Sequence, residues 1–194
     1  MRSKQNHILE LFFNSSRQWH FEELLREAGI SRPQLVKWLK HLRKKGIIKR
    51  IKKKCKMPYY VQDSQSPSFI SLKKLYGYQK IAESGLLEHI ITLKDIKVAV
   101  LFGSFSRSDW YKDSDIDIFI YGNDRDLNTG KYEVKLKRDI QIHKAGTKED
   151  LKKMDKLLPY IFSGEFVKGS LQDMGIEIHA NDLEEFGTFR HIHG

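Results

Sequence analysis

The sequence predicts an α+β protein of two domains, the first made of helices with a small sheet and the second α/β with a mixed sheet. Charge divides the chain, since residues 1–60 hold 16 Lys and Arg against 4 Asp and Glu, and residues 61–194 hold 19 against 21, giving +10 in all. Three helical patterns and two short strands fill the basic part, whereas a strand, a tight turn and an acidic strand follow later. We expect domains at 1–62 and 96–194, joined by a linker helix region at 63–95.

Three helices are predicted in the first domain. Apolar residues recur at helical spacing over residues 8–13, 21–28 and 35–42. Gly29 ends the second pattern as a left-handed C-terminal residue. The segment Ser31-Arg32-Pro33-Gln34 is a capping box with proline in the first turn, which predicts the start of the third helix.

The turn between the second and third helices is short, and a basic hairpin follows. Only residues 29–31 separate the two helices, and residues 47–61 form two apolar strand patterns around a lysine-rich tip. Residues 18–20 are a candidate third strand. Together these patterns resemble a winged helix-turn-helix domain, in which the third helix enters the major groove of DNA and the hairpin follows the phosphates.

This resemblance implies a set of DNA-binding residues on the third helix and the hairpin. The side chains expected to face DNA from the helix are Arg32, Gln34, Lys37, Lys40 and Lys44, and those expected to neutralise phosphates are Lys49, Arg50, Lys52, Lys53, Lys54 and Lys56. Lysine outnumbers glutamine and asparagine in these segments, which favours contact with the DNA backbone over recognition of the bases. A solvated basic face, or a protein-binding winged helix, remains the alternative.

A second group of residues carries the chemistry. The continuous apolar run of residues 98–102 predicts a buried strand that stops at Gly103. Gly103 and Ser104 predict a tight turn, in which Ser104 caps a short helix and the free backbone N–H groups suit a phosphate. On the strand from Asp115 to Tyr121, Asp115 and Asp117 share one face because side chains alternate.

Two carboxylates on one face repel each other unless a cation lies between them. Hard divalent ions such as Mg²⁺ bind carboxylate oxygens together with substrate phosphates. The pair therefore predicts a site for a metal and a nucleotide.

The Gly-Ser turn, the ten-residue spacing and the Asp-x-Asp strand resemble the signature of the DNA polymerase β-like nucleotidyltransferase superfamily, in particular its minimal branch. The resemblance implies that Gly103 and Ser104 hold the triphosphate of an NTP, with Arg107 as the basic residue after the turn. It also implies that Asp115 and Asp117 bind Mg²⁺ or Mn²⁺ for in-line nucleotidyl transfer. An ordinary loop entering a strand is the simpler alternative for each motif alone.

The third carboxylate that the resemblance implies is ambiguous. Residues Tyr132–His143 alternate as a strand would, and the register places Gln141 where an acid is expected. Asp139 lies two residues away on the same face, about 6.6 Å along a strand, and is the alternative metal ligand. Glu133 is a weaker candidate, because residues 131–136 also fit a short helix.

The remaining segments predict helices and one short strand. Residues 66–90 predict a helix with apolar residues on more than one face, which Gly77 and Gly85 could interrupt. So wide an apolar surface suggests packing between the domains or against a second copy in a homodimer. A helix begins at residues 147–150 and could continue over 160–166, with Gly164 as a break, and residues 175–179 are expected to form a last strand. His191 and His193 lie in a tail where two histidines are usually incidental.

Composition favours a cytoplasmic protein. Cys55 is the single cysteine, which excludes an intramolecular disulfide and any multi-cysteine zinc site. No apolar run approaches the roughly 20 residues of a membrane span, and the N-terminus lacks the apolar segment of a signal peptide.

Two functions are consistent with these patterns. The first is a metal-dependent nucleotidyltransferase that moves a nucleoside monophosphate from an NTP to an unknown acceptor, with DNA bound by the N-terminal domain. The second is a DNA-binding regulator whose degenerate transferase domain senses nucleotide, an alternative that Gln141 favours. A template-directed polymerase is not expected, because the chain leaves no room for separate fingers and thumb domains.

Overall fold

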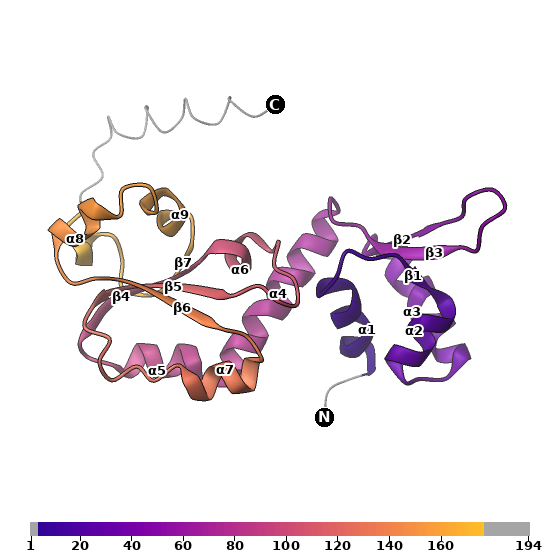
Figure 1. The fold of residues 1–194 in the computed structure, drawn as a ribbon, viewed down its shortest axis with the longest axis horizontal. Helices are drawn as coiled ribbons and strands as arrows, with labels where there is room; N and C mark the ends of the chain where they lie inside the picture. Colours follow the sequence, from indigo (N-terminus) through magenta and orange to yellow (C-terminus); the bar gives the residue numbers. More distant parts are fainter. Residues whose placement is uncertain (1–3, 177–194) are drawn as a thin grey trace.

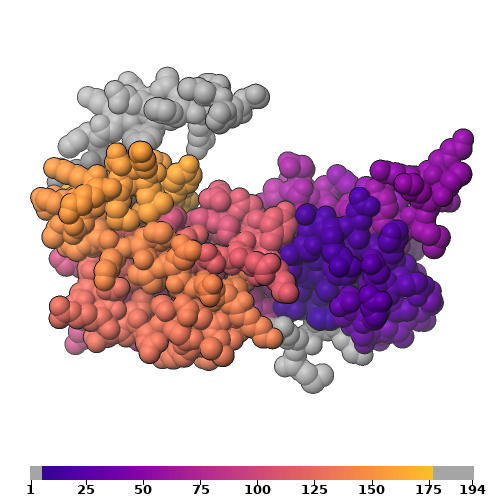
Figure 2. Space-filling view, viewed as in Figure 1, coloured from indigo at the N-terminus to yellow at the C-terminus, as the bar shows by residue number. Residues whose placement is uncertain are grey.

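The computed structural model describes residues 4–176, which form two lobes joined by a long helix (Figure 1). The N-terminal lobe comprises residues 4–62 and the C-terminal lobe residues 86–176. The helix α4, Pro67–Ser84, runs diagonally between them. The space-filling view shows the two lobes in contact, with the tip of a hairpin protruding from the far end of the N-terminal lobe (Figure 2).

Three helices and a three-stranded sheet make up the N-terminal lobe. The helices are α1 (Lys4–Phe13), α2 (Phe21–Ala28) and α3 (Arg32–Lys44). The strands are β1 (Trp19–His20), β2 (Ile48–Ile51) and β3 (Tyr59–Gln62), paired antiparallel in the order β1-β3-β2. The predicted helices, the two hairpin strands and the candidate third strand are therefore confirmed as elements.

Local signals explain where these helices end and begin. Gly29 adopts φ +59° at the end of α2, a left-handed conformation that glycine reaches without a steric penalty. The Ser31 and Gln34 side chains form the expected capping box at the start of α3.

The linker is helical but is interrupted once. Gly85, at φ +86°, separates α4 from α5 (Leu86–Thr92), as expected. Gly77 does not break α4. A Cβ atom at Gly77 would lie 3.1 Å from Trp110 Nε1, so this glycine lets α4 pack closely against that indole. No helix within residues 4–176, α4 included, is long and apolar enough to cross a membrane.

A four-stranded mixed sheet forms the centre of the C-terminal lobe, in the order β6-β5-β4-β7. Its strands are β4 (Ile96–Phe102), β5 (Ile116–Gly122), β6 (Ile140–Ala145) and β7 (Glu165–Lys168). Only β5 and β6 run parallel. The other elements of this lobe are α6 (Gly103–Arg107), α7 (Gly130–Leu136), α8 (Lys148–Lys153), α9 (Leu158–Phe162) and the 3₁₀ turn Gln172–Met174.

The two faces of the sheet are covered by different helices. Figure 1 shows α5 and α7 on one side and α8 and α9 on the other. The side chains of Ile116, Ile118 and Ile120 lie in the core cluster on the α5 and α7 side, whereas Phe119 and Tyr121 lie in the second cluster. This alternation is the one that the sequence predicted for the acidic strand.

Three predicted elements differ in the structure. The strand predicted over Tyr132–His143 is wrong in its first half, where α7 forms instead, and the alternative of a short helix is confirmed. The helical continuation predicted over residues 160–166 ends at Phe162, and β7 follows because the chain turns at Gly164 to pair with β4. Gly175 ends the 3₁₀ turn at φ +68° and starts no strand, while residues 177–179, His191 and His193 lie outside the described residues.

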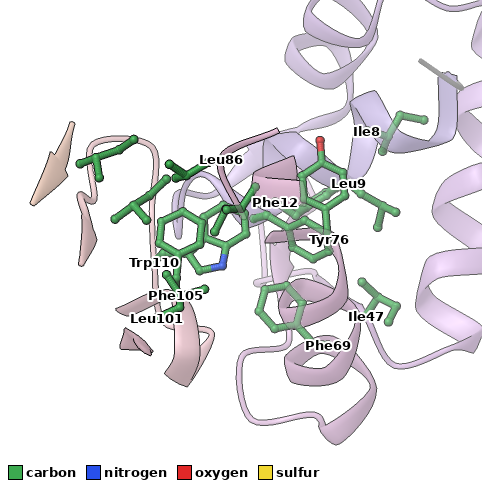
Figure 3. Close-up of a cluster of buried hydrophobic side chains, with 14 of the residues drawn as sticks. Ile8, Leu9, Phe12, Ile47, Phe69, Tyr76, Leu86, Leu101, Phe105 and Trp110 are labelled. Atoms are coloured by element: carbon green, nitrogen blue, oxygen red, sulfur yellow. The ribbon is translucent and has the colours of Figure 1, made fainter. Parts of the chain in front are cut away.

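Aromatic side chains join the two lobes in one cluster (Figure 3). Phe13 of α1 lies 5.5 Å from Phe69 of α4 and 6.1 Å from Trp110, measured between ring centroids. Trp110 in turn stacks on Phe105 at 5.1 Å. The lobes thus share a continuous apolar core, which restricts their movement relative to each other.

One lysine is buried in this aromatic junction. The Lys73 side chain of α4 is 1% exposed, and its Nζ lies 4.5 Å from the Tyr111 ring centroid and 4.8 Å from that of Trp110. Burial lowers the pKa of Lys73 to about 8, although the charge of Asp109 opposes the shift. The cation–π contacts therefore compensate only part of the cost of removing the ammonium from water.

We predict that K73M raises the free energy of unfolding at pH 7 by about 1–3 kcal/mol, because methionine fills the site without a charge. In the wild type, stability rises from about pH 8 toward 10.5, since the unfolded chain retains a proton that folded Lys73 has released. The advantage of K73M should therefore shrink between pH 7 and pH 9.5 in urea unfolding. The exposed Lys94, changed to methionine, is the control, and an advantage of K73M independent of pH would contradict the prediction.

Candidate nucleotide site

The register between β4 and β5 brings the Gly-Ser turn against the acidic strand. Phe102, the last residue of β4, pairs with Asp117 of β5, so that Gly103 lies beside the Asp117 carboxylate. Gly103 has φ +70°, and a Cβ atom there would lie 2.2 Å from Asp117 Oδ2. Both the backbone conformation and the contact therefore require glycine.

The helix after the turn starts one residue earlier than expected. Gly103 is already the first residue of α6 and Phe102 precedes it as the N-cap, so the prediction that Ser104 caps this helix is wrong. Ser104 is the second residue of α6 and is half-buried. Ser106 Oγ donates a hydrogen bond of 3.0 Å to the Gly103 carbonyl oxygen, which fixes the turn from the helix side.

Asp115 and Asp117 lie where β5 begins. Both side chains are half-buried, and the apolar residues that alternate with them are fully buried in the core below. The strand is thus fixed by its apolar face, which holds the two carboxylates in place at the edge of the C-terminal lobe.

Gln141 occupies the third position beside these aspartates. It pairs with Asp117 across the parallel β5–β6 ladder, and its Nε2 donates a hydrogen bond to Asp115 Oδ2. Asp139 precedes β6 and is exposed, and its carbonyl oxygen accepts a hydrogen bond of 2.9 Å from the Ile116 amide. Between residues 4 and 176, no three His, Cys, Asp or Glu side chains lie close enough together to form a metal site.

His143 is a site residue that the sequence analysis did not single out. Its Nε2 lies 3.4 Å from Asp117 Oδ1, and its ring meets Phe102 edge-on at 5.2 Å. This nitrogen is buried and has no hydrogen-bond partner within the described residues. The available signal was the alternation of β6, which places His143 on the face of Gln141.

The two other candidates near the site have local partners. Arg107 is exposed at the end of α6, and its Nε donates to Asp109 Oδ2 at 3.0 Å. Glu133 of α7 accepts a hydrogen bond of 3.3 Å from the Ile140 amide through Oε1. Glu133 therefore supports the start of β6 and is not directed at the aspartates.

The basic residues expected to contact DNA are exposed on α3 and the hairpin, but some have partners. Arg32 forms two hydrogen bonds of 2.9 Å with the Glu22 carboxylate, and Lys49 pairs with Asp63 at 2.8 Å. The Gln34 side chain is used in the capping box. A groove of about 610 Å³ between α3 and β2 is lined by Lys40, Arg43, Lys44, Ile48, Lys49 and Arg50. Arg43 was not among the predicted residues.

The comparison with protein families agrees with this geometry. Residues 86–171 match the family model described as Polymerase beta, Nucleotidyltransferase. The match supports the nucleotidyltransferase superfamily for this region. It includes the Gly103 turn, both aspartates and all four strands of the mixed sheet. No curated protein and no solved structure matches the chain.

We predict that G103A destabilises the C-terminal lobe by about 2–4 kcal/mol, through the positive φ and the contact with Asp117. The measurement is chemical denaturation followed by circular dichroism. G130A is the control, because the nearest atom to a Cβ at Gly130 is 3.5 Å away. Equal stability of G103A and G130A would show that the turn adapts to a side chain.

Proposed function

We propose that the protein transfers a nucleoside monophosphate from an NTP to an acceptor hydroxyl, with pyrophosphate leaving. The observation that supports this proposal most strongly is the contact of Gly103 with Asp117, because it joins the first turn of α6 to the carboxylate pair. The first backbone amides of a helix have no acceptor within the helix. In such a site the Gly103-Ser104 turn would hold the triphosphate, and Asp115 and Asp117 would hold a divalent cation that offsets its charge. Arg107 borders the turn and is available to the phosphates if it leaves Asp109.

The residues present fit one divalent cation. Asp115 and Asp117 supply hard oxygen ligands of the kind that Mg²⁺ and Mn²⁺ prefer, and the close approach of Gly103 brings the backbone of the turn next to Asp117 Oδ2. When bound, the ion neutralises charge on the transferred phosphoryl group. Gln141 adds no charge, and its amide N–H already donates to Asp115.

A regulator that senses nucleotide without transferring it is the second candidate. The Gln141–Asp115 hydrogen bond favours it, because a neutral amide replaces the third carboxylate that would share a second cation. The two candidates differ in chemistry but share the nucleotide site.

We expect calorimetric titration with ATP, GTP, CTP or UTP to show binding that requires Mg²⁺ or Mn²⁺. D115N/D117N should weaken this binding at least tenfold, because the two ligands lose their charge. D126N, at an exposed loop position, is the control. If the wild type binds none of the four nucleotides, the proposed site is wrong.

We predict that the wild type binds one Mn²⁺ per chain in the presence of a non-hydrolysable ATP analogue, and that Q141D binds two. An added carboxylate beside Asp115 supplies the charge that a second cation needs. Equilibrium dialysis with electron paramagnetic resonance detection measures the concentration of free Mn²⁺. The number of ions bound per chain is then obtained from the difference between total and free Mn²⁺. Two ions in the wild type would support transfer by the two-metal route and remove the argument for a sensing role.

We further propose that the N-terminal lobe is a winged helix-turn-helix domain that binds DNA through α3 and the hairpin. Support comes from its three helices, its β1-β3-β2 sheet and the basic groove between α3 and β2. Lys37, Lys40 and Lys44 are exposed along α3, and Arg50, Lys52, Lys53 and Lys54 are exposed on the hairpin. Lys49 can contribute only by leaving Asp63.

We predict that K37A/K40A/K44A lowers the slope of log K against log salt concentration by about 2–3, because each lost phosphate contact removes about 0.9. Fluorescence anisotropy with a random DNA duplex at several salt concentrations measures the slope. K94A/K152A/K156A removes the same charge from exposed positions outside the N-terminal lobe. Equal slopes for the two variants would exclude α3 from the DNA interface.

A further inference from the structure

The loop that leads into the acidic strand is held by a single half-buried guanidinium. Arg138 follows α7, and its Nη1 donates to the carbonyl oxygens of Tyr111, Lys112 and Ser114 at 2.5, 2.7 and 2.8 Å. These three residues lie within the four that precede Asp115. The two hydrogens of Nη1 are shared among three carbonyl oxygens, and hydrogen bonds from a charged donor are stronger than neutral ones, so Arg138 constrains the path of this loop.

The same guanidinium reaches the N-terminal lobe. Arg138 Nη2 donates to Asn14 Oδ1 at 3.2 Å, and the Lys112 amide donates to the Asn14 carbonyl oxygen at 3.1 Å. Asn14 directly follows α1. One asparagine at the end of α1 therefore contacts both the loop and the arginine that holds it.

A second contact between the lobes reaches the same loop. Gln62, the last residue of β3, donates through Nε2 to the Tyr111 hydroxyl at 3.3 Å. The N-terminal lobe thus contacts residues 111–112 at two points, one at the end of α1 and the other at the end of β3.

The surroundings of Arg138 keep its guanidinium in one orientation. Its Cζ lies 5.2 Å from the ring centroids of both Phe105 and Trp110, the stacked pair at the junction between the lobes. Burial lowers the pKa of Arg138, while the charges of Asp113 and Asp115 act against this shift. A charged group in this position is stable only while its hydrogen bonds are kept.

We propose that Arg138 is a positioning residue that sets Asp115 for nucleotide binding, and that it makes this setting depend on Asn14 of the N-terminal lobe. This inference rests on the proposed function, since it assigns Asp115 to the nucleotide site. As a consequence, residues 111–114 have all of their hydrogen bonds only when the N-terminal lobe packs against the C-terminal lobe. A partner that moves α1 would change the affinity of the nucleotide site by releasing Arg138 Nη2.

The first test measures the loop without any nucleotide. The amides of Lys112 and Ser114 are hydrogen-bonded to Asn14 and Tyr111, so hydrogen exchange followed by mass spectrometry reports the order of this loop. We expect exchange in residues 111–115 to become at least tenfold faster in R138A. N14A should give a smaller increase, because only the Nη2 contact is lost. R125A, at an exposed position, should leave exchange unchanged.

The second test is chemical rescue of nucleotide binding. Arg138 borders a cavity of about 460 Å³, which gives a small cation room to enter. We expect R138A to raise the Kd for Mg·ATP about tenfold and ethylguanidinium to restore it to within about threefold of wild type. Ethylguanidinium should have no effect on R125A or on the wild type. If the alanine variant does not fold, R138K is used in the exchange measurement instead, and faster exchange in residues 111–115 is expected because lysine keeps the charge but cannot reach the same four oxygens.

The outcomes separate this inference from the proposed function. Unchanged exchange in R138A overturns the inference, and so does weaker Mg·ATP binding that ethylguanidinium fails to restore in a folded variant. A wild type that binds no nucleotide overturns the proposed function. In that case the exchange measurement still decides whether Arg138 and Asn14 order the loop.

Discussion

The pairing register of β4 and β5 is the constraint on which the candidate site depends. It places Phe102 opposite Asp117, and the chain can then turn beside the carboxylate only if residue 103 has no side chain. Because a shift of one residue would reverse every side chain of β5, the buried isoleucines that fix the strand also fix the two aspartates. Core packing and site geometry are therefore specified by the same pairs of residues.

The site combines a complete turn and carboxylate pair with a neutral third position. Gln141 and His143 both lie on β6 and both contact an aspartate, one through an amide hydrogen bond and the other at 3.4 Å. Gln141 is neutral, so among the described residues the two aspartates have no third carboxylate beside them. The charge at this position, more than the fold, thus separates transfer from nucleotide sensing as proposed functions.

The lobes are connected by both apolar and polar contacts at one place. Phe13, Phe69 and Trp110 form the apolar part, and Asn14 with Arg138 forms the polar part next to it. Apolar packing supplies most of the stability, whereas the hydrogen bonds specify a single arrangement of the loop before Asp115. Lys73 lies in the same junction with a lowered pKa, so the junction carries a cost that other packing must offset.

The sequence by itself determined the elements whose signals are local. Gly29, the Ser31–Gln34 capping box, the alternation of β5 and the Gly103 turn each act within a few residues, and each was predicted. The sequence did not determine β7, which forms because Glu165–Lys168 pairs with the edge of β4 that β5 leaves open. It also did not determine the helical state of α7, because the alternating pattern of that segment fits a strand equally well. The sequence left both Gln141 and Asp139 as candidates for the third position, and only the tertiary structure decided that Gln141 lies beside Asp115 and that Arg138 joins α1 to the loop. These contacts link residues 26 and 124 positions apart. Contacts across such separations depend on strand register and lobe packing, which no short stretch of sequence encodes.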